Sequence, residues 1–378
     1  MKMRNAWSIR GVSLIELMIA LVIGLLLTLG IIQIFHASRT AYALSEALAR
    51  NQENSRFAFD YLEPDFRMAG HYGCINDQSQ LRTTNAFKNN MDSEIANGQK
   101  TALNFAISIQ GYEAIQTGPG ATVTLGSAAA GWLPQNPPPE IVQLNPLAGS
   151  DIIVLRFMNS ASSGVTQILT STDTTQFLVP TSQWDSLIID GVNSPVLFGI
   201  SDCNNVDFFR ASSVQARAGV ITTNTPISRY GERPTAQTRL SRAESLVYYI
   251  ANNENQQPSL FRARYNGTTY VREELIEGVE SMQILYGQDS QVDVTKNPPS
   301  GRMNSYNTAA VMTDANQWRR VGSIQLGLLI RSPNRVTPDV SKKISLLGVN
   351  FTPPGNNDLR LRSAYEVTIA LRNRLYGN

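Results

Sequence analysis

The chain has 378 residues, of which 42% are hydrophobic and 16% charged, and its formal net charge is +2. A chain of this length fits either one long helix with one large domain or two smaller domains. The near-neutral balance lacks the clustered Lys and Arg that displace counterions from phosphates, so no nucleic-acid partner is expected.

The N-terminus divides into a short basic leader and an apolar run. Lys2, Arg4 and Arg10 are the charged residues of the leader. The run from Val12 to Phe35 would form a helix of ~36 Å, which is long enough to span a bilayer. Because basic flanks stay on the cytoplasmic side, we expect a single membrane pass with a cytoplasmic N-terminus and an exported body.

Two simpler interpretations of this segment stay open. One is a secretory signal peptide, for which Ala41-Tyr42-Ala43 would be the cleavage site, although the apolar region of a signal peptide has only roughly 7 to 15 residues. The other is a plain anchor, which leaves Glu16 unexplained. A charged group costs about 2.5 to 3.5 kcal/mol near the bilayer centre, so Glu16 suggests a partner for its carboxylate.

A cut between Gly11 and Val12 would provide that partner. The new α-amino group of Val12 would lie one helical turn from Glu16, on the same face and at the positive end of the helix dipole. The carboxylate could then pair with the terminus of its own chain or with that of a neighbouring subunit.

The residues around this cut resemble the type IV prepilin signal. They read Gly11-Val12-Ser13-Leu14-Ile15-Glu16-Leu17, after a basic leader and before an unbroken apolar run. The resemblance implies a precursor in the bacterial inner membrane, from which a prepilin peptidase removes residues 1–11 and whose Val12 amine is then methylated. It also implies that Glu16 guides the helix into a growing filament. Val12 stands where such proteins usually have phenylalanine.

The helix is expected to continue beyond the transmembrane segment 12–35. An apolar stripe at helical spacing comprises Ala37, Ala41, Leu44, Leu48, Phe59, Leu62 and Phe66. Pro64 should kink or end the helix, and we assign residues 36–70 to its extracytoplasmic part. The outer half can pack beneath a globular domain, whereas the inner half needs lipid or other subunits to cover it.

Residues 71–378 are expected to form a β-rich periplasmic domain. Short apolar runs of strand length occupy residues 151–157, 176–179, 185–189, 196–200, 245–250 and 281–286. Alternating apolar and polar residues over 324–330 and 365–371 predict antiparallel strands with one buried face. A short helix is predicted around residues 273–279.

Short patches along the body resemble the PilW family of type IV pilus minor pilins. They are Ala69-Gly70-His71-Tyr72-Gly73-Cys74, Ser201-Asp202-Cys203, Pro258-Ser259-Leu260-Phe261-Arg262, Glu277-Gly278-Val279-Glu280, Tyr286-Gly287 and Leu371-Arg372-Asn373-Arg374. The resemblance implies an α+β type IV pilin fold, in which a long N-terminal transmembrane helix packs on an antiparallel sheet. Residues 241–378 would carry the central sheet, and residues 75–240 would be a large β-rich insertion.

The same resemblance implies a structural role. A PilW-like minor pilin would prime type IV pilus assembly, join the tip complex of the pilus, and support adhesion and twitching motility. Its partners would be other minor pilins, the major pilin, the prepilin peptidase, the pilus assembly platform and a tip adhesin. A pseudopilin of a type II secretion system, and a membrane-anchored periplasmic binding module or enzyme, are the alternatives.

Cys74 and Cys203 are the two cysteines of the chain. In the periplasm they can pair, and we expect a disulfide, with two buried free thiols as the alternative. A zinc site would be short of ligands, because His71 is the one histidine near either cysteine.

The sequence contains none of the motifs that mark common catalytic sites. It has no Gly-x-Ser-x-Gly, no His-Glu-x-x-His and no phosphate-binding loop. Asp289, Asp293 and Asn297 lack the acidic pattern and the glycine of a calcium loop. We therefore expect no enzyme, no catalytic residues, no metal site and no cofactor.

Overall fold

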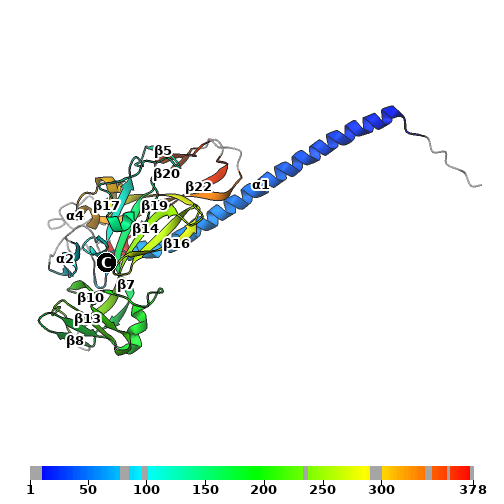
Figure 1. Cartoon of the computed structure of the whole chain (residues 1–378). Coiled ribbons are helices and arrows are strands. Elements are labelled where there is room, and N and C mark those ends of the chain that lie inside the picture. The colour runs from blue at the N-terminus through cyan, green and yellow to red at the C-terminus, as the bar shows by residue number, and fades with distance from the viewer. Residues whose placement is uncertain are drawn as a thin grey trace, which may run out of the picture.

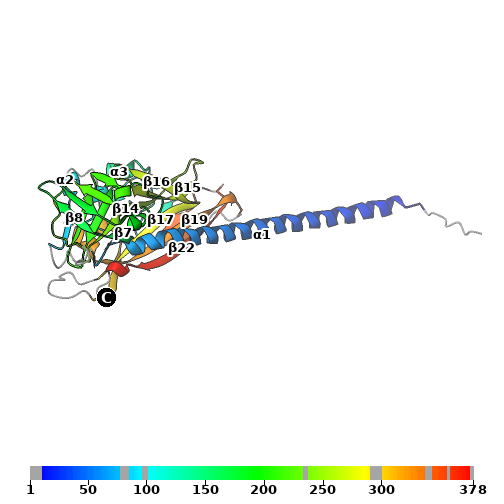
Figure 2. The same ribbon diagram turned by 90° about the horizontal axis from the view of Figure 1, so that it is seen from below.

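The computed structural model describes residues 11–76, 85–95, 101–232, 237–289, 300–336, 343–355 and 358–374. One helix, α1 (Leu14–Met68), projects from a β-rich body (Figure 1). Its N-terminal part stands free, and its last turns lie along the body in both views (Figures 1 and 2). The α+β class is confirmed, with one long apolar helix at the N-terminus and a body of largely antiparallel strands.

Helix α1 begins after the N-cap residue Ser13 and has 55 residues, which corresponds to ~80 Å. The alternative that Pro64 ends the helix is wrong, because Pro64 lies inside it and the helix continues to Met68. A proline removes one backbone donor and crowds the preceding turn. Leu62 and Phe66 on either side of it are completely buried, and their packing holds the last turns in place.

Two sheets form most of the body. The strands of the first are β3 (Phe87–Asn89), β4 (Ile109–Ala114), β6 (Trp132–Leu133), β7 (Ile152–Gly164), β10 (Leu197–Ser201), β11 (Val206–Arg210), β14 (Arg239–Asn252), β15 (Pro258–Tyr265) and β16 (Tyr270–Glu277). They follow the order β3-β11-β10-β14-β7-β4-β6, with β15 beside β14 and β16 beside β15. The second sheet consists of β17 (Val279–Asp289), β18 (Met303–Asn307), β19 (Val321–Arg335) and β22 (Arg360–Ala370), in the order β18-β17-β19-β22.

Smaller elements complete the body. β1 (His71–Tyr72) and β2 (Ile75–Asn76) form a hairpin after α1. A third sheet has the order β12 (Ser213–Gln215), β13 (Val220–Thr223), β9 (Thr175–Leu178), β8 (Gln167–Thr170), and a fourth has the order β20 (Ile344–Leu346), β21 (Val349–Thr352), β5 (Thr122–Thr124). The short helices are α2 (Asp92–Ile95), α3 (Pro139–Val142) and α4 (Ala315–Arg319), with 3₁₀ turns at Thr101–Leu103, Thr181–Leu187, Ala216–Ala218, Ala309–Val311 and Arg372–Arg374.

Most of the predicted strands coincide with observed ones. The runs at 151–157, 176–179, 196–200, 245–250, 281–286, 324–330 and 365–371 fall in β7, β9, β10, β14, β17, β19 and β22. The strand predicted at 185–189 is wrong, since residues 181–187 form a 3₁₀ helix. The helix predicted at 273–279 is also wrong. Those residues have good helix formers, but pairing with β15 makes them strand β16, a tertiary contact that overrides local propensity.

One hydrophobic core lies between α1 and the two main sheets. From α1 it takes Ala58, Leu62 and Phe66, all completely buried. The sheets contribute, among others, Ile153, Leu155, Leu246, Tyr248, Met282, Ile284, Ile324, Leu326 and Leu328. Full burial of one large apolar side chain stabilises a fold by about 1.5 to 3 kcal/mol, so this core fixes how α1 leaves the body.

Toward the N-terminal half of α1, the buried residues are small or polar. Ala47, Asn51 and Ser55 are buried, and the Asn51 side-chain amide donates to the Ser363 hydroxyl over 3.4 Å. The Asn54 amide donates to the Glu277 carbonyl over 3.2 Å. The body therefore covers α1 from Ala47 onward, whereas the earlier stripe positions Ala37 and Ala41 are exposed.

The segment 75–240 is built partly into the main sheet and partly into a separate lobe. Strand β7 pairs with β14 from Gly164↔Arg239 to Ile153↔Tyr248, and β10 pairs with β14 as well. Strands β8, β9, β12 and β13 form the lobe at the lower left of Figure 1. Its hydrophobic core is shared with the main sheet, because it includes Phe198 of β10, Phe209 of β11 and Leu240 of β14. The boundary at residues 240 and 241 lies close to the start of β14, and the division into insertion and central sheet stays a prediction.

A buried pair of carboxyl groups joins the two main sheets. Asp151 precedes β7 and accepts backbone N–H bonds from Ala114 of β4 and from Ile284 of β17, each over 2.9 Å. Glu113 lies against Asp151, and both side chains are buried. Burial and the charge of Asp151 raise the pKa of Glu113 well above its ordinary value. The Glu113 carboxyl therefore keeps its proton at neutral pH.

We predict that this proton makes the body less stable as the pH rises. Above about pH 4.5 the unfolded glutamate is ionised while the folded one keeps its proton, so the free energy of unfolding falls by about 1.4 kcal/mol per pH unit. In Glu113→Gln an amide replaces the protonated carboxyl, and this slope should become shallower. Chemical unfolding of the detergent-solubilised chain at about pH 5 and about pH 8 measures it. Glu254→Gln, at an exposed position, is the control and should keep the wild-type slope. An equal slope in Glu113→Gln would refute a protonated Glu113.

Candidate assembly site

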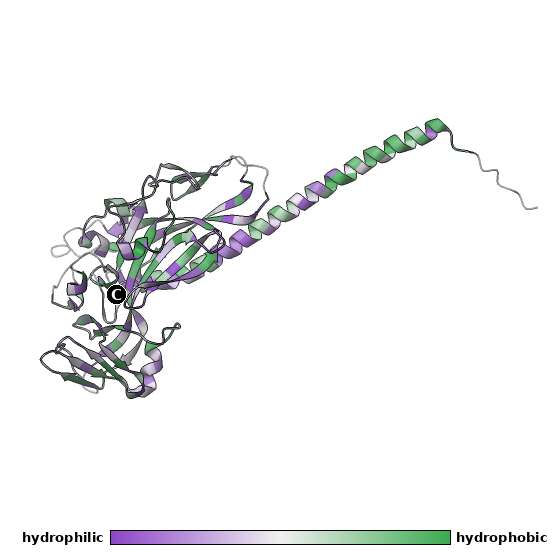
Figure 3. Cartoon of the chain, in the orientation of Figure 1, coloured by the Kyte–Doolittle hydropathy of each residue, from purple (hydrophilic) through white to green (hydrophobic). Residues whose placement is uncertain are grey.

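The first half of α1 is bare, meaning that the body does not cover it and its side chains are exposed. In the part of the chain that the structure describes, α1 is the helix long and apolar enough to cross a membrane. Figure 3 shows its free end as almost continuously hydrophobic and its body-proximal half as mixed. Leu14 is 78% exposed and Leu25 65% exposed. Soluble monomeric proteins rarely expose an apolar surface of this extent to water. Lipid or other protein is therefore needed to cover it.

A capping box organises the start of α1. The Ser13 backbone N–H donates to Glu16 Oε2 over 2.9 Å, and the Glu16 backbone N–H donates to Ser13 Oγ over 3.2 Å. Two backbone donors at the open end of the helix are thereby satisfied, and the carboxylate sits at the positive end of the helix dipole. Glu16 thus has a partner within its own chain, which the sequence reasoning missed. The signal for it was present, because Ser-x-x-Glu before an apolar run is the signature of a capping box.

The capping box leaves Glu16 able to accept further hydrogen bonds. An ionised carboxylate has about four lone-pair sites, and the bond from Ser13 uses one of them. Gly11 and Val12 precede the helix and are exposed, so the peptide bond between them is accessible from solvent. The basic leader residues Lys2, Arg4 and Arg10 lie outside the described residues. Cleavage at Gly11, methylation of Val12 and the intermolecular role of Glu16 stay predictions.

Charged pairs mark the outer half of α1. Glu46 and Arg50 form an ion pair of 2.8 Å, and Glu63 pairs with Arg67 one turn before the helix ends. Such exposed i,i+4 pairs contribute only about 0.3 to 0.5 kcal/mol each. Their main consequence is solubility, because charged side chains keep the exposed face of this half of α1 hydrated. The first half has no such ion pairs.

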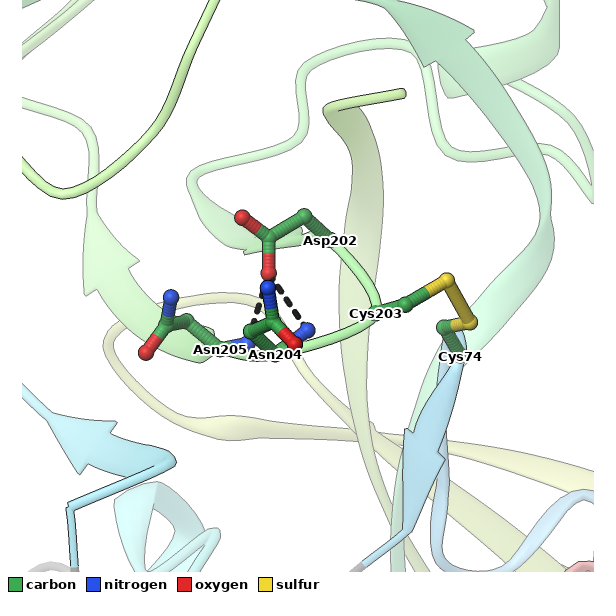
Figure 4. The surroundings of a disulfide bond; sticks show 5 residues. All are labelled: Cys74, Asp202, Cys203, Asn204 and Asn205. Atoms are coloured by element: carbon green, nitrogen blue, oxygen red, sulfur yellow. Dashed lines mark hydrogen bonds between the residues drawn. A yellow bond between two sulfur atoms is a disulfide. The ribbon is translucent and has the colours of Figure 1, made fainter. Parts of the chain in front are cut away.

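Cys74 and Cys203 form a disulfide, with their Cα atoms 4.8 Å apart (Figure 4). Cys74 lies in the turn between β1 and β2, just after α1, and Cys203 lies in the turn between β10 and β11. The Asp202 carboxylate shapes the second turn by accepting the backbone N–H groups of Asn204 and Asn205 over 2.7 and 2.6 Å. The disulfide links the end of helix α1 to the side of the body from which the four-stranded lobe extends.

We predict that removing the disulfide destabilises the body without unfolding it. The sequence separation is 129 residues, and in the chain-entropy model a loop of this size contributes about 5 kcal/mol. Cys74→Ser with Cys203→Ser should therefore lower the midpoint of thermal unfolding measured by circular dichroism in detergent. Alkylation before a non-reducing gel should show no free thiol in the wild type and one in each single mutant. A free thiol in the wild type, or an unchanged midpoint in the double mutant, would contradict the assignment.

The acidic residues considered for a calcium loop are placed only in part. Asp289 ends β17, and its carboxylate accepts from the Ser300 hydroxyl and from the Gly301 backbone N–H over 2.9 and 2.8 Å. Asp293 and Asn297 lie outside the described residues. Across the described ranges, no three His, Cys, Asp or Glu side chains gather as metal ligands would.

Comparison with known protein families adds one finding. Residues 247–373 match the family model PilW, Type IV Pilus-assembly protein W. The match covers about a third of the chain and runs from the second half of β14 through β22, so it contains the whole four-stranded sheet against which α1 packs. Comparisons with curated proteins and with solved structures gave no match.

Proposed function

We propose that this chain is a minor pilin of the PilW family, inserted into filaments by α1, because residues 247–373 match the family model PilW, Type IV Pilus-assembly protein W. The observation that carries the proposal is the combination of this family match with a helix whose first half is bare and apolar. A helix of this kind suits a subunit that waits in the inner membrane and then exchanges lipid for the helices of its neighbours.

The proposed mechanism starts with the removal of the leader after Gly11. The cut creates an ammonium group at Val12, one residue before the N-cap Ser13. Glu16 already accepts from Ser13 and has acceptor sites left, so the ammonium of a neighbouring subunit can bind there. A charged pair is favoured strongly in an apolar surrounding, provided that both partners are present. Assembly would thus supply the partner that a buried Glu16 needs.

The shape of the body supports a place at the pilus tip. The four-stranded lobe widens the molecule to one side of α1 (Figure 1). A subunit within the shaft has neighbours above and below it, whereas a subunit at the tip has none above and can carry extra volume. We propose that this chain joins other minor pilins to prime assembly, that the major pilin and the assembly platform are its further partners, and that adhesion and twitching depend on it.

We predict that the mature chain starts at Val12 and that its amine is methylated. Mass spectrometry of the N-terminal peptide, from protein purified out of the membranes of its own host, measures both features. An intact Met1, or a start near Ala43, would contradict the proposal and favour a plain anchor or a secretory signal.

We predict that Glu16→Ala yields a processed, membrane-inserted chain that does not enter filaments. The substitution removes the carboxylate that would bind the neighbouring ammonium, while the body, whose core begins at Ala58, stays intact. Immunoblots of sheared pili and of membranes measure the distribution of the protein. Glu46→Ala, on the same helix and paired with Arg50 at the surface, is the matched control and should be incorporated normally.

The same strains separate a pilus from a secretion system. Under the proposal, Glu16→Ala reduces surface pili and leaves protein secretion normal. Normal incorporation of Glu16→Ala would refute the pairing mechanism. Normal pili together with defective secretion would favour the type II pseudopilin.

A further inference from the structure

A pocket of about 370 Å³ opens on the sheet formed by β14, β15 and β16, and one of its lining residues, Arg262, pairs with Asp65 of α1. Residues 242–244, 262, 264, 265 and 271–273 of the three strands line it, together with residues 190–192 and 194–197, which lead into β10. The volume lies within the range of small-ligand cavities. The pocket belongs to the body and is separate from the bare half of α1.

The floor of the pocket is a buried ion pair. Arg242 and Glu244 have side chains only 3% and 4% exposed, and the Arg242 guanidinium donates to the Glu244 carboxylate. A second arginine, Arg264, places its Nε 3.5 Å from Glu244 Oε2. Arg242 also binds the carboxylate of Asp190 at 3.3 Å, which ties the floor to the segment that leads into β10.

The side of the pocket repeats this pairing. Arg262 donates from Nη1 to Asp65 of α1 over 3.2 Å and from Nη2 to Glu273 of β16 over 2.9 Å. A guanidinium has five N–H donors, so Arg262 keeps donors for a ligand, and Arg264 does too. The Glu273 side chain is 60% exposed, which leaves acceptor sites on its carboxylate.

Charge balance decides which ligands suit the pocket. The lining contains Arg242, Arg262, Arg264 and Arg272 and the acids Asp190, Glu244 and Glu273. The charges balance once Asp65 is added, which lies outside the lining and pairs with Arg262. An anion or a cation would leave an uncompensated charge in a partly enclosed site. A purely apolar ligand would strip water from the ion pairs without replacing its hydrogen bonds.

We propose that the pocket binds a neutral sugar ring. Each hydroxyl group of a sugar is both donor and acceptor, so two adjacent hydroxyls can donate to Glu273 and accept from Arg262 at the same time. The C–H face of the ring would lie on the apolar side chains at the rim, of which Val271 is 56% exposed. This inference rests on the pocket alone and holds whether or not the chain is a pilin.

Saturation-transfer NMR on the full chain, in a detergent without a sugar headgroup, tests the proposal. The probes are the methyl glycosides of glucose, galactose, mannose and N-acetylglucosamine, each at about 10 mM, and then the disaccharides of any that bind. At least one neutral glycoside should show saturation transfer. Disaccharides that bind more tightly than the methyl glycoside would identify the end of a longer glycan as the ligand, and equal affinity would identify a single sugar.

Glu273→Gln should weaken binding of that glycoside about tenfold, because it removes a charged acceptor. Glu274→Gln is the matched control. Glu274 is the next residue of β16, lies on the other face of the strand and bonds to Asn253 outside the pocket, so this variant should bind like the wild type. The melting temperature of both variants checks that the body stays folded.

Three results would overturn the proposal. The first is that no neutral glycoside binds, and the second is that acetate or inorganic phosphate binds at this pocket in its place. The third is that Glu273→Gln and Glu274→Gln affect binding equally, which would put the sugar elsewhere on the molecule.

Discussion

The burial of Leu62 and Phe66 between the two main sheets is the contact on which the rest of the molecule depends. It holds the last turns of α1 against β-strands that are distant in sequence, and it leaves the first half of the same helix with no surface of its own body to lie on. Hydrogen bonds from Asn51 and Asn54 and the ion pair between Asp65 and Arg262 orient the helix further. Side-chain packing between the body and the last turns of α1 thus fixes the direction in which the helix leaves the body.

The polarity of α1 changes along its length because its surroundings change. Before Arg39 the only charged residue of the helix is Glu16. Its carboxylate lies in the first turn, where it accepts the backbone N–H of Ser13 in the capping box. Beyond Arg39, charged residues recur on the exposed face while the buried face passes from Ala47 to Phe66. A helix covered by solvent along its whole length would not need an apolar first half, and one embedded along its whole length could not carry these ion pairs.

The sequence was sufficient for those parts of the fold that local patterns determine. The α+β class and most strands of the body followed from period and length, since alternation over residues 324–330 and 365–371 is a strong signal for a half-buried strand. Strand β16 was mistaken for a helix because its partner, β15, is what makes it a strand. The nine-stranded order, with β7 between β4 and β14, depends on pairings over long sequence separations that no local pattern contains.

The sequence identified single residues of the candidate site, but it did not reveal the contacts between residues. Gly11, Val12 and Glu16 stood out because a carboxylate in an apolar run requires an explanation, and Cys74 and Cys203 because there are only two cysteines. The contact of Glu16 with Ser13 was overlooked, because the partner sought for the charge was an α-amino group created by cleavage. Buried polar positions such as Asn51 and Asp151 were invisible for a different reason. The partner of Asn51, Ser363, lies 312 residues away in the sequence, and that of Asp151, Ile284, lies 133 residues away. Folding of the body brings each pair together.

The capping box changes what the N-terminal carboxylate has to accomplish. In a lone helix Glu16 satisfies the Ser13 N–H and stabilises the positive end of the helix, so the helix can form before any neighbour is present. An ammonium group that arrives later does not have to displace this bond, because a carboxylate accepts several. Under the proposed assembly mechanism, folding of the helix start and recognition of a neighbour would therefore not compete for the carboxylate. The Glu16 side chain, three residues after the N-cap Ser13, would then serve both the capping box and the proposed intermolecular pair.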